Sequence, residues 1–474
     1  MSIIGRVSEQ EQLKKLLNSN NAEFLVIYGR RRVGKTFLIK EFFNETFSFY
    51  STGVLSKKAK DELTAFNQSL KKYGSNITSI PKNWFDAFER LQNLIESEII
   101  KPDSRYGKIT IFLDELPWMD TVKSDFKAAL DFFWNSYLSS KKNILLIVCG
   151  SATSWILNNL LNSKGGFYNR VTSKIHLKPF NLYELEKLVN EVNKNSLTKK
   201  ELIEAYMIFG GIPYYLNLIN PNFSLVQNID NLFFKDGGML ENEFNILFSS
   251  LFNNYENHVK IIEALATNQA GLTRNQLLEK TKLSSGQTFT KILDELIECG
   301  FIKEYKNYIK AKNVPLYQII DPFTLFAFNF LVNKKSSMWQ YYIDTPSYYS
   351  WCGHSFETVC LNHIYEIKKI LGIDGIDSLE YSYFDNKKGG AQIDLIIDRK
   401  DNVINLCEMK FSNNKYNITD QYKENIINKV ETLRNVSKNN KQIVVTFITL
   451  NGINKSNSDI VRKEILANEL FIQR

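Results

Sequence analysis

The sequence lacks the features that would place a protein in a membrane or outside the cell. It contains no run of about 18 or more apolar residues, so we expect no transmembrane helix and no membrane partner. Its start, Met1–Arg6, has no basic segment followed by an apolar core, which argues against a secretory signal. Cysteine is scarce. The five scattered thiols predict reduced core residues and a cytoplasmic protein: Cys149, Cys299, Cys352, Cys360 and Cys407.

The composition is that of an ordinary folded protein. Hydrophobic residues make up 44% of the chain and charged residues 23%, which excludes wholesale disorder. A length of 474 residues predicts about three domains, each large enough for its own core. The net charge of +8 permits binding to nucleic acid, but spread over this length it does not argue for it.

Residues 29–36 read GRRRVGKT, a complete G-x-x-x-x-G-K-[ST] phosphate loop. An apolar segment of strand character, Glu23–Tyr28, precedes it, and Phe37–Phe43 carries apolar residues at helical spacing. Gly29 and Gly34 let the backbone curl so that successive N–H groups face phosphate oxygens. The helix that follows adds the partial positive charge of its N-terminus. Because the motif has this flanking strand and helix, a chance match is the weaker interpretation.

The loop predicts a site for ATP and Mg²⁺. Lys35 can reach the β- and γ-phosphates, and the Thr36 hydroxyl can bind Mg²⁺. The three arginines within the loop either assist in binding phosphate or face solvent. The expected nucleotide-binding residues are Gly29, Arg30, Arg31, Arg32, Val33, Gly34, Lys35 and Thr36.

A second acidic element supports this site. Lys108–Leu113 has the character of a buried strand and runs into Asp114 and Glu115. In a phosphate-loop NTPase, Asp114 would hold the Mg²⁺ shell and Glu115 would polarise the attacking water. Two acids are needed, because a carboxylate bound to the metal cannot also act as the base. The alternative is an ordinary Asp-Glu turn after a strand.

Three segments together resemble a known family. They are IIGRVSEQEQLKKLL, FLVIYGRRRVGKTFLIKEFF and IFLDELPWM, and they look like the archaeal-type ATPase family within the STAND branch of AAA+-like NTPases. The resemblance implies that Ser151, after the strand Ile144–Gly150, senses the γ-phosphate. It implies that Arg170 stabilises transition-state charge, either in cis or from a neighbouring subunit of a homo-oligomer. It also implies that Pro213, in Gly210–Leu216, belongs to a helical lid near the adenine.

Each of these three residues has a simpler interpretation. Ser151 could cap the helix that follows the strand. Arg170 could be a surface arginine or a salt-bridge partner. The segment Gly210–Pro213 could be a turn between helices, since Gly and Pro are the usual residues of turns.

The segment from His258 to Lys310 predicts a winged helix. Three short helical patterns are followed by two strand patterns, Gly300–Tyr305 and Tyr308–Lys310. The third helix, after Leu283, would expose polar residues that could contact DNA, although its second half is acidic and would repel phosphate. We therefore leave open DNA binding and a packing or oligomerisation role. The two groups are Ser285, Gln287, Thr288, Thr290 and Lys291, followed by Asp294, Glu295 and Glu298.

The last part of the chain predicts a hairpin with a metal-dependent hydrolytic site. Asp394 lies among aliphatic residues of the first strand, and a turn follows at Arg399–Asn402. Period-2 alternation puts Glu408 and Lys410 on the same face of the second strand. Two carboxylates can bind Mg²⁺, and the lysine can orient or polarise water. Glu357, on an upstream helix, is a further possible ligand.

This pattern resembles the PD-(D/E)xK nuclease superfamily, in particular the C-terminal DUF234-type domain that follows archaeal-type ATPases. One departure is that Gln392-Ile393 stands where a proline-aspartate is typical. Gln421-Tyr422 only loosely suggests the glutamine-tyrosine helix motif of some nucleases. Such a domain can keep the fold after losing its activity. A zinc site remains a weaker alternative to core packing at Cys352, His354, Cys360 and His363.

We therefore predict an α/β protein with a phosphate-loop NTPase parallel sheet and helical lid, a winged-helix middle domain and a C-terminal restriction-endonuclease-like α/β domain. The expected ranges are 1–225, 226–320 and 321–474. The leading hypothesis is an ATPase coupled to a nuclease-like domain that acts on or binds nucleic acid. The runner-up is a regulatory ATPase that binds DNA or protein, with an inactive third domain. A non-enzymatic nucleotide-gated scaffold is a third class.

Overall fold

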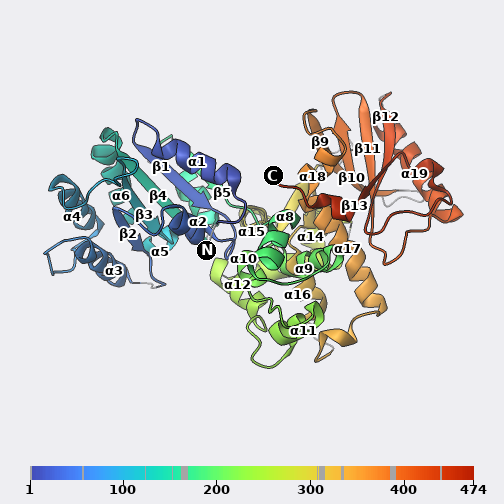
Figure 1. Ribbon diagram of the computed structural model, residues 1–474, viewed down its shortest axis with the longest axis horizontal. Coiled ribbons are helices and arrows are strands. Elements are labelled where there is room, and N and C mark those ends of the chain that lie inside the picture. Colours follow the sequence, from blue (N-terminus) through green and yellow to red (C-terminus); the bar gives the residue numbers. More distant parts are fainter. Residues whose placement is uncertain are drawn as a thin grey trace. The chain divides into compact units, whose positions relative to one another are not determined.

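The computed structural model divides into two compact units, residues 1–178 and 179–474, each described here by itself (Figure 1). The predicted domain boundary at 225 falls inside the second unit, and the three domain ranges stay a prediction. The described residues are 3–55, 58–122, 124–151, 153–161, 169–252, 254–268, 270–306, 308, 315–332, 336–384, 391–437 and 440–474.

The first unit is built on a five-stranded parallel sheet with strand order β2-β3-β4-β1-β5. The middle strands are wholly or almost wholly buried, which explains why they read as continuous apolar runs rather than as alternating patterns. The predicted parallel α/β sheet is thus confirmed. Its strands are β1 (Glu23–Tyr28), β2 (Phe49–Thr52), β3 (Ile109–Asp114), β4 (Ile144–Gly150) and β5 (Ser173–His176).

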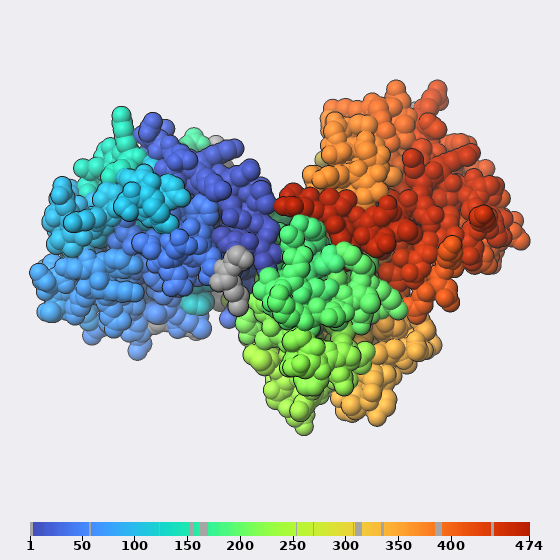
Figure 2. All heavy atoms as spheres, viewed as in Figure 1, coloured from blue at the N-terminus to red at the C-terminus, as the bar shows by residue number. Residues whose placement is uncertain are grey.

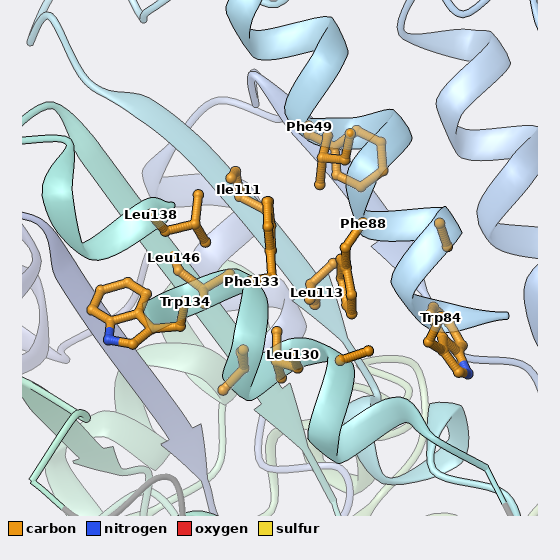
Figure 3. Packing of buried hydrophobic residues seen from close by; sticks show 14 of the residues in the cluster. Phe49, Trp84, Phe88, Ile111, Leu113, Leu130, Phe133, Trp134, Leu138 and Leu146 are labelled. Atoms are coloured by element: carbon orange, nitrogen blue, oxygen red, sulfur yellow. The ribbon is translucent and has the colours of Figure 1, made fainter. Parts of the chain in front are cut away.

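Helices accompany this sheet, and α4 and α6 pack on the main apolar core (Figure 3). Phe88 of α4 and Phe133 of α6 stack with ring centroids 5.0 Å apart, while Trp134 contacts Phe24 of β1 at 4.9 Å. This packing fixes the sheet from one face. The helices are α1 (Val7–Leu17), α2 (Lys35–Phe42), α3 (Ala59–Lys72), α4 (Trp84–Glu96), α5 (Leu116–Met119), α6 (Phe126–Ser136) and α7 (Thr153–Ile156).

The second unit begins with helices and contains a small antiparallel sheet of order β6-β8-β7. The strand that pairs with β7 is β8. Of the predicted second wing strand, Tyr308–Lys310, the structure describes only Tyr308. Ile309 and Lys310 lie outside the described residues. The elements are α8 (Leu182–Glu186), α9 (Lys199–Phe209), α10 (Pro213–Leu216), α11 (Leu225–Ile229), α12 (Glu243–Leu251), α13 (Glu256–Ala266), β6 (Leu272–Thr273), α14 (Arg274–Thr281), α15 (Gln287–Glu298), β7 (Ile302–Tyr305), β8 (Leu316–Ile319), α16 (Pro322–Phe330), α17 (Pro346–Asn362) and α18 (Ile364–Ile370).

The chain ends in a mixed five-stranded sheet of order β13-β12-β11-β10-β9. Strand β10 is antiparallel to both of its neighbours, β9 and β11, whereas β11, β12 and β13 run parallel to one another. Helix α19 (Asp420–Ser437) packs Leu433 and Ile426 against the sheet. The strands are β9 (Ser378–Phe384), β10 (Gln392–Arg399), β11 (Val403–Lys410), β12 (Gln442–Thr449) and β13 (Lys463–Leu466).

A buried polar network ties the C-terminal residues to α18 and α8, and Figure 2 shows the red C-terminal surface lying against the orange surface of this region. The carboxylate of Glu366, which has no exposed surface, accepts hydrogen bonds from Arg474 Nε at 2.7 Å and Asn181 Nδ2 at 2.8 Å. The fully buried His363 accepts from the Leu182 backbone N–H at Nε2 and donates from Nδ1 to the Val359 carbonyl. His363 is therefore neutral.

We predict that His363 makes stability fall with acidification. Burial lowers its pKa to about 4, so between the unfolded pKa near 6.5 and about 4 the unfolded chain binds the proton more tightly. This contribution of His363 to the free energy of unfolding is thus fully present above pH 6.5 and is lost as the pH falls through this window. The variant His363→Gln should take up about one proton fewer on unfolding at pH 5, measured from the pH dependence of urea unfolding. An unchanged proton uptake would contradict the assignment.

Candidate nucleotide site and C-terminal carboxylate cluster

The phosphate loop connects the end of β1 to the start of α2. Gly29 has φ of 144°, and a Cβ atom there would lie 2.3 Å from the Leu177 carbonyl oxygen. Gly34 caps α2 with φ of 92°, and Arg32 also has left-handed backbone geometry at φ of 71°. The positive φ angles of Gly29 and Gly34 thus favour glycine at both positions. At Gly29 the close approach of the Leu177 backbone also excludes a side chain.

Lys35 and Thr36 are placed at the first turn of α2. The ammonium group of Lys35, only 6% exposed, donates to the carbonyls of Gly29 at 2.9 Å and Arg30 at 3.0 Å. The Thr36 hydroxyl donates to the Asp114 carboxylate at 2.9 Å, across from the end of β3. A hydroxyl and a carboxylate at this distance form an oxygen donor set that suits Mg²⁺. The residues predicted to hold the ion therefore lie together.

Strand order places Ser151 beside the acidic pair. Because β4 lies between β1 and β3, the residue that follows β4 meets the loop after β3. Ser151 donates to Glu115 Oε2 from its hydroxyl at 2.9 Å and from its backbone N–H at 3.3 Å. Glu115 itself has a left-handed backbone, with φ of 47°. Such strain in a non-glycine residue typically costs about 1–3 kcal/mol and is common at functional sites.

The structure gives the remaining predicted residues of the first unit clear positions. Arg30 is buried, so the solvent-facing alternative is wrong for this residue, whereas Arg31 and Arg32 are half-buried and Val33 is buried. Arg170 forms an ion pair with Asp131 of α6 within the same chain. The alternative interpretation of Arg170 as a salt-bridge residue therefore has a partner, and its role at the nucleotide stays a prediction.

Two residues near the loop escaped the sequence reasoning. Arg6, which is 7% exposed, donates to the Val33 carbonyl at 3.5 Å from a left-handed position before α1. His176, at the end of β5, stacks on Tyr28 with centroids 4.7 Å apart, and burial together with Lys178 and Lys35 lowers its pKa. The only sequence feature that pointed to either residue was the Gly5-Arg6 pair before the first helix.

Pro213 begins α10 in the second unit. The two preceding glycines both have positive φ, of 67° and 66°, and a Cβ on Gly211 would lie 2.2 Å from the Phe180 carbonyl oxygen. The segment is therefore a tight turn into a helix packed closely on its own unit. A role of Pro213 near the adenine stays a prediction.

The C-terminal hairpin brings the predicted carboxylates to one face. The antiparallel register of β10 and β11 ends with Leu395 opposite Cys407, and Asp394 and Glu408 are the next residues on the two strands. The charge of Glu408 raises the pKa of Asp394, so the two carboxyl groups lie near each other. A bulge against β9 lies at Ile393–Ile396 and surrounds Asp394. Glu408 is fully buried, and its Oε2 lies 3.7 Å from Lys410 Nζ.

Two residues of α19 complete the surroundings of Glu408. Lys429 Nζ donates to Glu408 Oε1 at 2.5 Å, and the Tyr422 hydroxyl donates to Oε2 at 2.5 Å. These residues are two helical turns apart on the same face of α19. The sequence signal for Tyr422 was the Gln421-Tyr422 pair, whereas nothing marked Lys429.

The pKa values of the other two acids, Glu357 and Asp394, are raised. Burial, followed by the charge of Asp394, raises the pKa of Glu357 well above its ordinary value. Burial and the charge of Glu408 likewise raise the pKa of Asp394, whose Oδ1 accepts from Gln392 at 3.1 Å. At Glu357 and Asp394, burial and the neighbouring carboxylates thus outweigh the positive charges of Lys410 and Lys429.

The described residues of the second unit do not form a complete metal cage. Over the described ranges, no three His, Cys, Asp or Glu side chains are grouped closely enough to hold a metal ion. The metal role of Glu357, Asp394 and Glu408 therefore stays a prediction. The zinc alternative finds no support either, since His363 is engaged by backbone groups and Cys360 is buried. All five cysteines are buried and free, as expected for core residues.

Comparison with known proteins agrees with the first unit. The fold and site define a phosphate-loop ATPase domain. Residues 4–219 match the family described as "ATPase domain predominantly from Archaea". No helix in the described part of the chain combines the length and apolar character needed to cross a bilayer.

Individual relatives carry less information. An uncharacterized protein of Methanocaldococcus jannaschii is 27% identical over 377 residues, covering 77% of this chain and 78% of its own. An uncharacterized ATP-binding protein of the same organism is 51% identical over 39 residues, which are 8% of this chain and 66% of that protein. The Walker-type ATPase PABY2304 of Pyrococcus abyssi aligns at a TM-score of 0.47 and 20% identity, covering 69% of this chain and 96% of that chain.

We predict that Ser151 positions Glu115. The change Ser151→Ala removes a hydrogen bond to a charged group, worth about 1.5–3 kcal/mol, so ATP turnover should fall roughly tenfold or more. ATP affinity, measured by calorimetry, should stay within about twofold, and Ser151→Thr should restore part of the rate. A loss of affinity with unchanged turnover would mean that Ser151 acts on the nucleotide instead.

Proposed function

We propose that the protein binds ATP with Mg²⁺ and hydrolyses it. The observation that supports this most directly is the hydrogen bond between Thr36 and Asp114, with Lys35 fixed over the loop beside them. Thr36 and Asp114 would hold the ion, which supplies charge neutralisation to the phosphates. Lys35 would orient the terminal phosphates, and backbone N–H groups of residues 29–34 would bind their oxygens.

Glu115 would be the residue that positions and polarises the attacking water. It is free for that role because Asp114, not Glu115, bonds to Thr36. Ser151 holds Glu115 from the neighbouring strand, so any movement of Ser151 on nucleotide binding would be passed to the base. Arg170 would join the site, in cis or from a second subunit, by exchanging Asp131 for phosphate charge.

We further propose that nucleotide state is coupled to a nuclease-like C-terminal domain of the DUF234 type. The proximity of Asp394 and Glu408, with Lys410 on the same face and Glu357 electrostatically near, supports a divalent-metal site that cleaves or grips nucleic acid.

The main alternative is a regulatory STAND-type ATPase with an inactive third domain. A specific observation favours it: both carboxylate oxygens of Glu408 are already bonded, to Lys429 and Tyr422. A buried carboxylate satisfied in this way has no need of a metal.

In either case the winged-helix segment could contact DNA. Its third helix α15 exposes the polar residues expected of such a surface, including Gln287, Thr288 and Lys291. The repulsion expected from the acidic half is weakened, because burial and the neighbouring Asp294 raise the pKa of Glu298 to about 7. The acidic half of α15 therefore still argues against DNA binding, but less strongly.

For the ATPase we expect two variants to fail in different ways. Lys35→Ala should abolish ATP binding, because it removes the cation that faces the phosphates. Glu115→Gln should bind ATP like wild type and lose at least about 100-fold in turnover, the usual contribution of a general base. Glu89→Gln, an exposed glutamate of α4, is the matched control. Wild-type turnover in Glu115→Gln would remove Glu115 from the mechanism.

For the C-terminal domain we expect nicking of supercoiled DNA in Mn²⁺ that survives Lys35→Ala. The isosteric changes Asp394→Asn and Glu408→Gln should abolish it, since they remove ligand charge with little change of shape. Asp401→Asn, in the exposed hairpin turn, serves as the control. If wild-type protein does not nick, or if Asp394→Asn nicks normally, the regulatory ATPase with an inactive third domain is the better account.

A further inference from the structure

The second unit contains a large cavity that neither the ATPase site nor the carboxylate cluster uses. Its volume is about 860 Å³, within the range of small-molecule sites. Its wall is formed by the end of α13 and the segment that follows it, by β6 and α14, and by α16, α17 and β10. It therefore lies where the winged-helix segment meets the C-terminal sheet.

The wall of this cavity is polar but carries no acid. Its lining includes the amides Gln276, Asn329 and Gln392, the indole of Trp351 and the imidazole of His354, and no Asp or Glu among the described residues. Burial lowers the pKa of His354 to about 4, so the ring is neutral at pH 7 and can donate and accept at once. Amide and imidazole groups of this kind match the mixed donors and acceptors on the edge of a nucleobase.

Two of these side chains have hydrogen-bonding capacity to spare. Trp351 is 3% exposed, and its Nε1 has no hydrogen-bond partner among the described residues. Gln276 uses its carbonyl oxygen to accept from the backbone N–H and hydroxyl of Thr273, which leaves its NH₂ group to donate. The protein thus holds donors at the cavity that its own described residues do not satisfy.

A single cation lies at the edge of the cavity. Lys280, on the exposed last turn of α14, lines it and forms no ion pair with any residue in the described ranges. A lysine that forms no ion pair with a described residue, at the edge of a neutral polar cavity, attracts an anion such as phosphate. The combination of an indole N–H donor, amides and one cation is complementary to a base with a phosphate attached.

We propose that this cavity binds a nucleotide, either free or as the end of a single strand. The indole N–H of Trp351 and the amides would hydrogen-bond the base, and Lys280 would hold the phosphate. Gln392 lines the cavity and also donates to Asp394 at 3.1 Å, so an occupant that competes for this amide changes the surroundings of Asp394. That coupling, but not the binding itself, rests on the proposed function of the C-terminal site.

The test uses full-length Lys35→Ala protein, in which we expect the phosphate loop not to bind nucleotide. The probes are AMP, GMP, CMP and UMP, and a hexathymidylate with and without a 5′-phosphate, followed by calorimetry. We expect binding to at least one phosphorylated probe, weakened tenfold or more by Lys280→Glu. Lys282→Glu makes the same charge change one residue beyond α14, outside the cavity lining, and should change binding less than twofold.

Each outcome bears on the proposal. Binding of monophosphates assigns a free nucleotide, and binding of only the 5′-phosphorylated strand assigns a strand end. No binding of any probe at millimolar concentration, or equal losses in Lys280→Glu and Lys282→Glu, overturns the site. Because the readout is binding, a failed nuclease assay would leave this result standing, whereas an active nuclease without binding would overturn only the cavity.

Discussion

The candidate ATPase site depends on the order of five parallel strands. Since β4 is inserted between β1 and β3, three polar chain segments meet at one edge: the phosphate loop, Ser151 and the Asp114-Glu115 pair. The sheet is held there by apolar packing with α4 and α6 rather than by the polar contacts themselves. Hydrogen bonds such as Thr36 to Asp114 therefore report a geometry that the core has already imposed, which is the condition for a preorganised site.

Sequence reasoning succeeded where the physics is local. The phosphate loop requires glycine at Gly29 because of its backbone angle and the nearby Leu177 carbonyl, and that requirement is visible as a motif. The apolar runs of β3 and β4 likewise indicate strands that are buried on both faces. The hairpin of Asp394 and Glu408 could be placed on one face because strand alternation has a period of two.

It failed where partners come from distant segments. In the sequence, Lys429 cannot be distinguished from an exposed helix lysine, because its contact with Glu408 forms only when α19 packs on the sheet. Arg6 contacts Val33, a residue 27 positions further along the chain. Strand β8 was missed because a longer connection than a tight wing separates it from β7. The neutral state of His363 depends on a backbone N–H from Leu182, which no local pattern reveals. Tertiary contacts decided each of these cases.

The chemistry proposed for the C-terminal domain depends on Asp394 and Glu357 rather than on Glu408. Glu408 is buried with Lys429 and Tyr422 as direct partners, so its charge is already compensated and removing either partner would be costly. Burial and the charge of Glu408 raise the pKa of Asp394, and burial and the charge of Asp394 raise the pKa of Glu357, so a proton or a cation at these two acids would relieve an unfavourable interaction. A domain that had lost its metal could keep the Glu408–Lys429 pair for stability alone, so the presence of the acid-x-lysine pattern is weak evidence for activity, whereas ionisation of Asp394 at neutral pH would be strong evidence.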